Sequence, residues 1–327
     1  MLAEMQKSPQ ISAVIPTYNR AALVGRAIES VLSQEYAPSE IVVVDDGSAD
    51  ETRRVLESYG DKVRGVYQPN AGVSAARNRG VREAKFAWIA FLDSDDCWAP
   101  GHLRRIVNAI EGTRGEAALY FADLKVGKKG GSSYWHHCGL KVNGEWEFRR
   151  DAGLWALMRV QPMMLQASVI SQRTYLEIGG LAEELRTRED TLMFFKLALL
   201  HPACAVAGCG TVMNSDDSIR LTRVYDAESL VYCNATIFLY RELLASLTTI
   251  GRERRQFLTD SLCAAYFGMG RVFARQGKYW SAMRNLALSC GISPSVFGKE
   301  LLGSLKRRVI AAGNGPGISG MSVGAKS

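Results

Sequence analysis

The sequence places three carboxylates directly after an apolar segment. Residues 88–92 are apolar, and Asp93, Asp95 and Asp96 follow them within four positions. Carboxylates this close repel one another unless a cation lies between them. Their hard oxygen ligands suit Mg²⁺ or Mn²⁺, which also bind substrate phosphates. We therefore expect a divalent metal site at Asp95, with Asp93 and Asp96, although a solvated acidic turn would produce the same pattern.

Further apolar segments also end in polar residues. Asp45 and Asp46 follow residues 41–44, where they could accept hydrogen bonds from a base or a ribose, or could cap the next helix. Arg77 and Asn78 lie in a segment with helical spacing. A guanidinium there could approach a diphosphate, or could only decorate a helix face. Because ligands of open α/β sheets bind beyond the carboxyl ends of the strands, these positions form one candidate site.

Apolar runs and helical periodicity alternate along the first part of the chain. The expected strands are 11–15, 41–44, 63–67 and 88–92, and helices are expected at 21–34, around Val55 and Leu56, and at 73–84. This alternation is typical of right-handed βαβ crossovers and predicts a mostly parallel sheet flanked by helices, which is the α/β class. A further helix is expected at 100–110 and a strand at 117–124.

The composition is that of an ordinary folded protein, with 47% hydrophobic and 22% charged residues. The net charge of +7 is uneven, because residues 241–327 hold 13 Lys and Arg against 4 Asp and Glu. This basic segment favours an anionic membrane surface or a lipid-linked phosphate over nucleic acid as a partner, or it is a solvated face. Seven scattered cysteines, no secretory signal in residues 1–10 and no clean spanning segment favour the cytoplasm, at the inner face of the membrane.

Four segments in order resemble glycosyltransferase family 2. They are AVIPTYN at 13–19, IVVVDDGS at 41–48, NAGVSAARNRG at 70–80 and FLDSDD at 91–96. The resemblance implies a GT-A fold and an inverting transfer of a sugar from a nucleotide-diphosphate donor, with UDP-sugars favoured. It implies Mn²⁺ or Mg²⁺ on the Asp-x-Asp pair. The donor-binding residues implied are Pro16, Thr17, Tyr18, Asn19, Asp45, Asp46, Arg77, Asn78, Asp93 and Ser94.

The resemblance continues downstream. Residues 166–180 and the segment 188–191 are similar to the family's region around its catalytic acid. By that likeness Asp190 is the base, with Glu189 as the alternative, and an acid at a helix amino terminus is kept ionised and able to take a hydroxyl proton. Both could instead only cap the helix. Arg220 and Arg223 lie where the family often has a loop that closes over the diphosphate.

The sequence between residues 125 and 150 is rich in glycine and aromatic residues. It contains Tyr134, Trp135, His136, His137 and Trp146. These side chains could stack on an acceptor sugar, but we favour a hairpin in which they pack together.

The carboxyl-terminal part has helical spacing. An antiparallel helix pair is expected at 262–275 and 279–289, followed by an amphipathic helix at 297–312. The expected domains are a catalytic domain at 1–224, a basic helical region at 225–312 that lies on a membrane or packs on the catalytic domain, and a disordered tail at 313–327.

The predicted activity is a metal-dependent transfer of a sugar to an acceptor hydroxyl in glycan, polysaccharide or glycolipid assembly. The Gln-x-x-Arg-Trp sequence of processive members is absent, which favours single additions. Two alternatives remain open. The acceptor could be a polyprenyl phosphate, whose anionic oxygen needs no base, or the protein could bind a nucleotide sugar without turnover.

Overall fold

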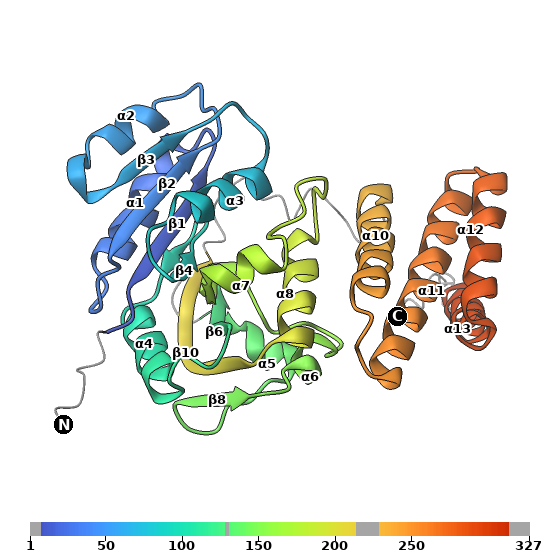
Figure 1. Cartoon of the computed structure of the whole chain (residues 1–327). Coiled ribbons are helices and arrows are strands. Elements are labelled where there is room, and N and C mark those ends of the chain that lie inside the picture. The colour runs from blue at the N-terminus through green and yellow to red at the C-terminus, as the bar shows by residue number, and fades with distance from the viewer. Residues whose placement is uncertain (1–7, 128–130, 214–228, 314–327) are drawn as a thin grey trace, which may run out of the picture. The chain divides into compact units, whose positions relative to one another are not determined.

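The computed structural model describes residues 8–127, 131–213 and 229–313. The chain divides into two compact units, Met1–Asp226 and Ala227–Ser327, and the expected boundary at residue 224 lies beside this division. Each unit is described by itself (Figure 1). Arg220, Arg223 and the expected tail beyond Gly313 lie outside the described residues.

The first half of the sheet is parallel, as the sequence predicts. Strand β1 (Ile11–Thr17) lies between β2 (Glu40–Asp45) and β4 (Trp88–Phe91), and β3 (Arg64–Tyr67) pairs with the outer side of β2. Every residue of β1 is buried, and so is every residue of β2 after Glu40. Burial on both faces explains why these strands are continuous apolar runs without polar alternation.

The second half of the sheet is mixed. Strand β9 (Ser168–Ser171) runs antiparallel to both β4 and β6 (Leu119–Val126), and β10 (Ala203–Met213) is parallel to β6. Two short strands, β5 (Cys97–Trp98) and β8 (Trp146–Arg149), pair antiparallel with β10. Within the described residues the order is β3-β2-β1-β4-β9-β6-β10-β5. The predicted parallel arrangement therefore applies to the strands from β3 to β4, because the next strand, β9, is antiparallel to both of its neighbours.

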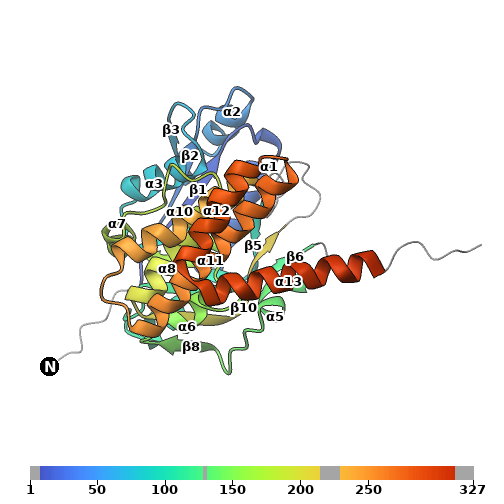
Figure 2. The same ribbon diagram turned by 90° about the vertical axis from the view of Figure 1, so that its right-hand side faces the viewer.

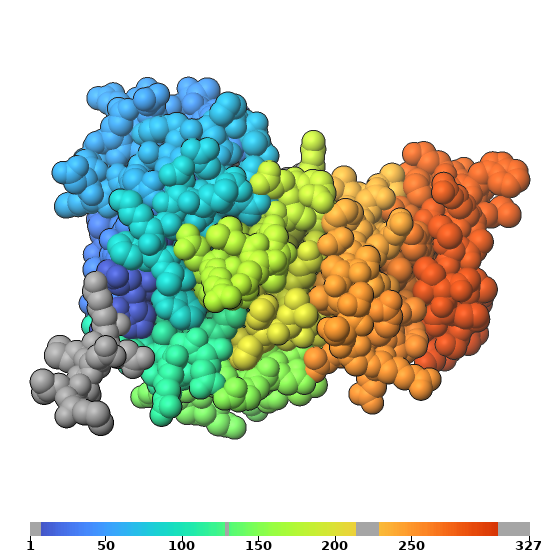
Figure 3. Space-filling view, in the orientation of Figure 1, coloured from blue at the N-terminus to red at the C-terminus, as the bar shows by residue number. Residues whose placement is uncertain are grey.

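Helices cover both faces of this sheet. On one face, α1 (Ala21–Leu32) and α4 (His102–Gly112) pack into the core formed with alternate residues of β1. On the other face lies α3 (Val73–Glu83), which packs on β1 and β2. The remaining helices of this unit are α2 (Thr52–Glu57), α5 (Tyr134–Cys138), α6 (Gly153–Ala156), α7 (Gln172–Glu177) and α8 (Glu189–Leu200). Figure 3 shows the residues of the first strands and helices (blue) at one end of the unit and those near 100–150 (green) at the other.

The aromatic segment forms a short helix, so the expected packing within a hairpin is wrong. Strand β7 (Ser132–Ser133) does pair back on β6, but Tyr134 to His137 lie beyond it in α5. The Ser133 hydroxyl accepts a hydrogen bond from the His136 N–H at 3.0 Å, which caps this helix. The Trp135 ring then packs edge-on against Phe121, with 5.7 Å between the ring centroids. The side-chain cap at Ser133 therefore stabilises a helical turn here, although aromatic residues have high strand propensity.

The second unit is helical, as expected. It contains α10 (Leu230–Ser246), α11 (Arg252–Arg275), α12 (Tyr279–Ile292) and α13 (Pro294–Gly313). Gly277, at φ 72°, allows the tight turn from α11 to α12, and Figure 2 shows these helices side by side with α13 running across them. Within the described residues, no helix combines the length and the apolar composition that a bilayer span needs.

Gly80 is required for the close approach of α3 to the sheet. A Cβ atom at this position would lie 2.4 Å from Val14 Cγ1, so Gly80→Ala should lower the free energy of unfolding by about 1–3 kcal/mol through overpacking. Chemical denaturation of the full chain measures this change. Gly25→Ala in α1 is the matched control, because its Cβ would meet its nearest neighbour at an ordinary 3.4 Å. Equal effects of the two substitutions would contradict the prediction.

Candidate active site

The three acids after β4 come together in space. Each of Asp93, Asp95 and Asp96 offers a carboxylate oxygen within 4.8 Å of the others. The Asp96 N–H donates to the Asp93 carbonyl at 3.0 Å, which closes a turn around Ser94, and Gln166 Nε2 lies 3.4 Å from Asp96 Oδ2. Carboxylates are the ligands that Mg²⁺ and Mn²⁺ prefer. The geometry therefore fits the divalent ion expected from the sequence.

Arg77 is a buried cation that joins three segments. Its side chain is 8% exposed, and its two terminal nitrogens contact Asp93 Oδ1 at 2.6 Å and Glu189 Oε1 at 3.2 Å. Burial disfavours the charged guanidinium, but the neighbouring acids, chiefly Asp93 and then Glu189, outweigh it and raise the pKa of Arg77 above its ordinary value. The charge expected near a diphosphate is thus already compensated by two carboxylates of the protein.

Glu189 has a raised pKa. Burial raises its pKa to about 7, the nearby charge of Asp190 acts in the same direction, and Arg77 opposes both. Its side chain is 13% exposed and its Oε1 atom accepts from Arg77. Glu189 therefore holds a guanidinium in place while it exchanges protons near neutral pH.

Asp190 has a different environment. Its Oδ1 atom accepts from the N–H of Thr191 at 2.6 Å and from the Thr191 hydroxyl at 3.2 Å. Its Oδ2 atom has no hydrogen bond to the part of the chain that the structure describes. Arg188, at φ 64°, occupies the cap position of α8 without a side-chain cap bond. The two acids thus lie within the first turn of α8, not at the cap position, and one Asp190 oxygen has no hydrogen bond among the described residues.

Asp45 and Asp46 organise the loops at the carboxyl edge. Asp46 accepts hydrogen bonds from Gln68 Nε2 at 2.7 Å, from the Ala71 N–H at 2.9 Å and from the Gly72 N–H at 2.8 Å. Asp45 accepts from the Ser48 N–H at 2.9 Å. These bonds hold the loop before α3 in position, so the backbone uses much of the hydrogen-bonding capacity expected to serve a nucleotide.

The loop after β1 is tied to the loop after β2. The Asn19 amide oxygen accepts from the Ala49 N–H at 2.8 Å, and the Asn19 N–H donates to Ser48 Oγ at 2.8 Å. Tyr18 is 48% exposed. The buried Thr17 hydroxyl, which follows Pro16, has no partner among the described residues. Tyr18 is therefore the residue of this segment that is open to a ligand, whereas the Thr17 hydroxyl is buried.

Asn78 makes internal contacts on the other side of α3. Its Nδ2 atom donates to the Leu181 carbonyl at 2.9 Å and to Glu183 Oε1 at 2.8 Å, and its Oδ1 atom accepts from the Tyr175 hydroxyl at 2.6 Å. These bonds connect α3 to the segment before α8. The role of Asn78 in donor binding stays a prediction, and the geometry favours positioning.

Sequence reasoning missed Gln166 and Tyr175 as individual residues of the site. Both lie in the stretch that is similar to the family, but neither has a local pattern that predicts a partner so distant in sequence. Tyr134 is also close to the site. Burial raises its pKa, as do Cys138 and, to a smaller extent, the charge of Asp190. Helix α5 therefore lies near the candidate base, which its sequence did not reveal.

Comparison with known proteins identifies the class. The family model described as "Glycosyl transferase family 2" matches residues 12–156. The succinoglycan biosynthesis protein ExoO of Rhizobium meliloti is 40% identical over 266 residues, which is 77% of this chain and 74% of ExoO. The chain belongs to glycosyltransferase family 2. An uncharacterized glycosyltransferase of Nostoc sp. is 40% identical over 119 residues, and this chain spans 37% of that protein's length.

Solved structures show the same fold. Staphylococcus aureus TarS (residues 1–349), crystallised with UDP-GlcNAc, aligns with a TM-score of 0.62 at 16% identity over 88% of this chain and 82% of that chain. A mannosyltransferase of Pyrobaculum calidifontis, crystallised with GDP-Man and Mn²⁺, gives a TM-score of 0.54 at 16% identity over 93% and 81% of the two chains. The expected GT-A fold with a helical carboxyl-terminal part is confirmed.

The raised pKa of Glu189 predicts a pH-dependent stability. A carboxyl group whose folded-state pKa lies above its unfolded value stabilises the fold at low pH, and this stability is lost as the pH rises from about 4.5 to about 7. The wild type should therefore lose up to about 3 kcal/mol over that range relative to Glu189→Gln. Denaturation curves at several pH values measure the difference. Glu184→Gln, at an exposed position, should follow the wild-type profile, and a Glu189→Gln profile parallel to the wild type would refute the assignment.

Proposed function

We propose that this protein is an inverting, metal-dependent glycosyltransferase that adds single sugars from a nucleotide-diphosphate donor to an acceptor hydroxyl in polysaccharide or glycolipid assembly. One observation carries the proposal. Arg77 contacts both Asp93 of the acid cluster and Glu189 beside Asp190, so the candidate metal ligands and the candidate base belong to one site. Family membership supports it, and so does the printed role of ExoO in succinoglycan biosynthesis.

The donor would lie against the loops that follow β1, β2 and β4. The structural neighbours bind UDP-GlcNAc and GDP-Man, the latter with Mn²⁺, and we favour a UDP-sugar here. Asp95 would hold the metal, with Asp93 and Asp96 beside it, and Mn²⁺ or Mg²⁺ would supply positive charge for the leaving diphosphate. Pro16, Thr17, Tyr18 and Ser94 would contact the nucleotide sugar, and of these residues Tyr18 is exposed.

Asp190 would act as the general base. Its Oδ2 atom takes the proton of the acceptor hydroxyl while that oxygen forms a bond to the anomeric carbon and the bond from this carbon to the diphosphate oxygen breaks. Attack from the face opposite the leaving group inverts the anomeric carbon. Glu189 is the weaker candidate because its carboxylate is paired with Arg77. Its role is to hold the guanidinium that fixes Asp93.

Two substitutions separate binding from transfer. With wild-type protein, UDP-sugars should raise the melting temperature more with Mn²⁺ than without it, because a ligand that binds the native state stabilises it by mass action. Asp95→Ala should abolish this metal-dependent shift. Asp190→Asn should keep the shift and should lower transfer by at least about a hundredfold. Thermal shift and release of UDP are the two measurements, and Asp151→Asn, outside the site, is the control.

The outcomes distinguish the alternatives. If Asp190→Asn keeps most of the transfer activity, the acceptor is an anion such as a polyprenyl phosphate, which needs no base. If donor binds but no sugar is transferred or hydrolysed, the protein is a binding protein. A wild type whose melting temperature responds to no UDP-, GDP- or dTDP-sugar would overturn the proposed function.

We further propose that the second unit contacts an anionic membrane surface, at the cytoplasmic face. Helix α12 exposes Tyr279 by 70%, Trp280 by 85% and Met283 by 61%. These positions lie within one broad arc of the helix, and the exposed Lys278 and Arg284 flank them. Aromatic side chains and flanking cations suit the headgroup region of a bilayer with anionic lipids. We call residues 278–284 the aromatic face.

Vesicle binding tests the aromatic face. The full chain should sediment with vesicles of 70% phosphatidylcholine and 30% phosphatidylglycerol, and less with pure phosphatidylcholine. Replacing Tyr279, Trp280 and Met283 together by Ser should weaken this binding at least about tenfold, because apolar surface no longer enters the interface. Leu154→Ser, at an exposed leucine of the first unit, should have no effect. Equal binding by the triple variant and the wild type would refute the aromatic face.

A further inference from the structure

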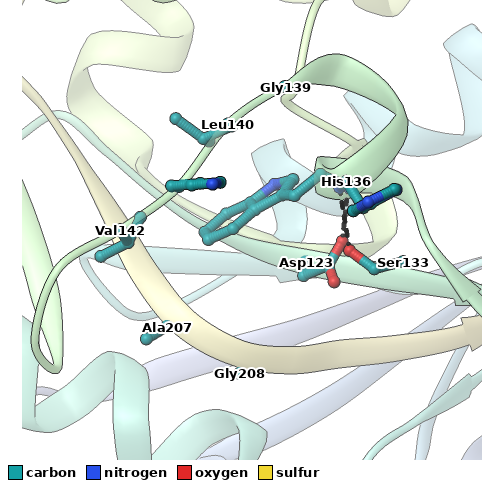
Figure 4. A pocket seen from close by; sticks show the side chains of 10 residues that line it. Asp123, Ser133, His136, Gly139, Leu140, Val142, Ala207 and Gly208 are labelled. Carbon is teal, nitrogen blue, oxygen red and sulfur yellow. Dashed lines mark hydrogen bonds between the residues drawn. The ribbon is translucent and has the colours of Figure 1, made fainter.

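A cavity of about 350 Å³ lies in the first unit, outside the residues assigned above. Its walls come from the end of β6, from α5, from the segment that follows α5 and from the irregular middle of β10. Figure 4 shows the side chains of Asp123, His136, Leu140 and Val142 around it. The volume falls at the lower end of the range for small-molecule sites, about 300–1,000 Å³.

Asp123 is the chemically informative residue of this cavity. It is 8% exposed. Its Oδ1 atom accepts from the Leu124 N–H at 2.8 Å and the Trp135 N–H at 2.9 Å, and its Oδ2 atom has no hydrogen bond to the described chain. This oxygen is accessible to solvent, so a ligand with hydroxyl groups in the cavity would supply donors to it. The other cavity walls include Leu140 and Val142, and exposed Lys141 and His136 lie at its rim.

The strand register places this cavity beside the candidate active site. Val169 of β9 pairs with Ala90 of β4 on one side and with Tyr120 of β6 on the other. Both neighbours run antiparallel to β9, so the loop after β4, which contains Asp93, and the last residues of β6, which include Asp123, lie at the same edge of the sheet. Tyr134, next to Trp135 in the wall, interacts electrostatically with Asp190. The cavity therefore lies at the same edge of the sheet as the acid cluster, on the side away from the donor-binding loops of β1 and β2.

We propose that this cavity binds one sugar residue of the acceptor, which rests on the proposed function. The Asp123 carboxylate accepts hydrogen bonds from sugar hydroxyls, Lys141 donates to a ring or hydroxyl oxygen, and the apolar walls contact the C–H groups of the ring. A nucleotide diphosphate is disfavoured, because the carboxylate at Asp123 repels phosphate. The site therefore selects a neutral, hydroxylated ring.

Two substitutions test the cavity. Asp123→Asn keeps the Oδ1 acceptor for both N–H groups and replaces only the free oxygen by a donor. Lys141→Met removes the charge from an exposed position, where folding is insensitive to it. The probe is an array of immobilised mono- and disaccharides of glucose, galactose, mannose, N-acetylglucosamine and rhamnose, in both anomers. Lys62→Met, at an exposed lysine of the first unit, is the control.

The expected result is that the wild type and Lys62→Met bind at least one of these sugars and that both cavity variants bind it at least about tenfold more weakly. Asp123→Asn should keep the metal-dependent thermal shift with UDP-sugars. If the wild type binds no arrayed sugar, or both cavity variants bind as the wild type does, the cavity proposal is overturned although the donor shift persists. If nucleotide sugars do not raise the melting temperature of the wild type, the proposed function is overturned instead.

Discussion

The candidate active site depends on one buried ion-pair network, that of Arg77 with Asp93 and Glu189. A guanidinium this deeply buried is stable only when its charge is compensated, and removing either acid would leave it with a single charged partner. The two acids come from the loop after β4 and from the start of α8, 112 residues from Arg77 in the second case. The network can form only when α3 packs closely on the sheet, which Gly80 permits at Val14. The packing of α3 on the sheet thus sets the positions of Arg77 and of the two acids that it contacts.

The polar residues of the site divide into two groups. Asp46, Asn19 and Asn78 direct their hydrogen bonds to neighbouring loops, and a loop held by such bonds presents its remaining groups in a fixed arrangement. Asp190 keeps a carboxylate oxygen without a partner in the described chain, and Tyr18 is exposed. Asp95 lies in the acid cluster. Preorganised polar groups of this kind stabilise developing charge without reorganisation during the reaction. The first group holds the loops in place, and under the proposed function the second group would contact the ligands.

The family match covers only part of the residues that form the proposed sites. The family model covers residues 12–156, which contain the four strand-end segments and most of the α5 region. The base candidate on α8 and the second unit lie beyond it. The cavity at Asp123 is formed partly by residues 139–142, which follow α5, and by residues 207–208 in the irregular middle of β10. Acceptor choice is thus expected to depend on segments outside the strand-end motifs, and the aromatic face of α12 belongs to a separate unit.

The sequence alone determined the parallel half of the sheet, the helices α1 to α4, α8 and α11 to α13, and the gathering of Asp93, Asp95 and Asp96, because apolar runs and helical periods are local patterns and four motifs in order resemble one family. Tertiary structure decided the rest. It set the reversed entry of β9, the pairing of Arg77 with Glu189 and the cavity at Asp123, and each of these features joins residues far apart in the chain. No local pattern records such contacts, because their energy comes from desolvation and charge compensation that exist only once the segments are packed together.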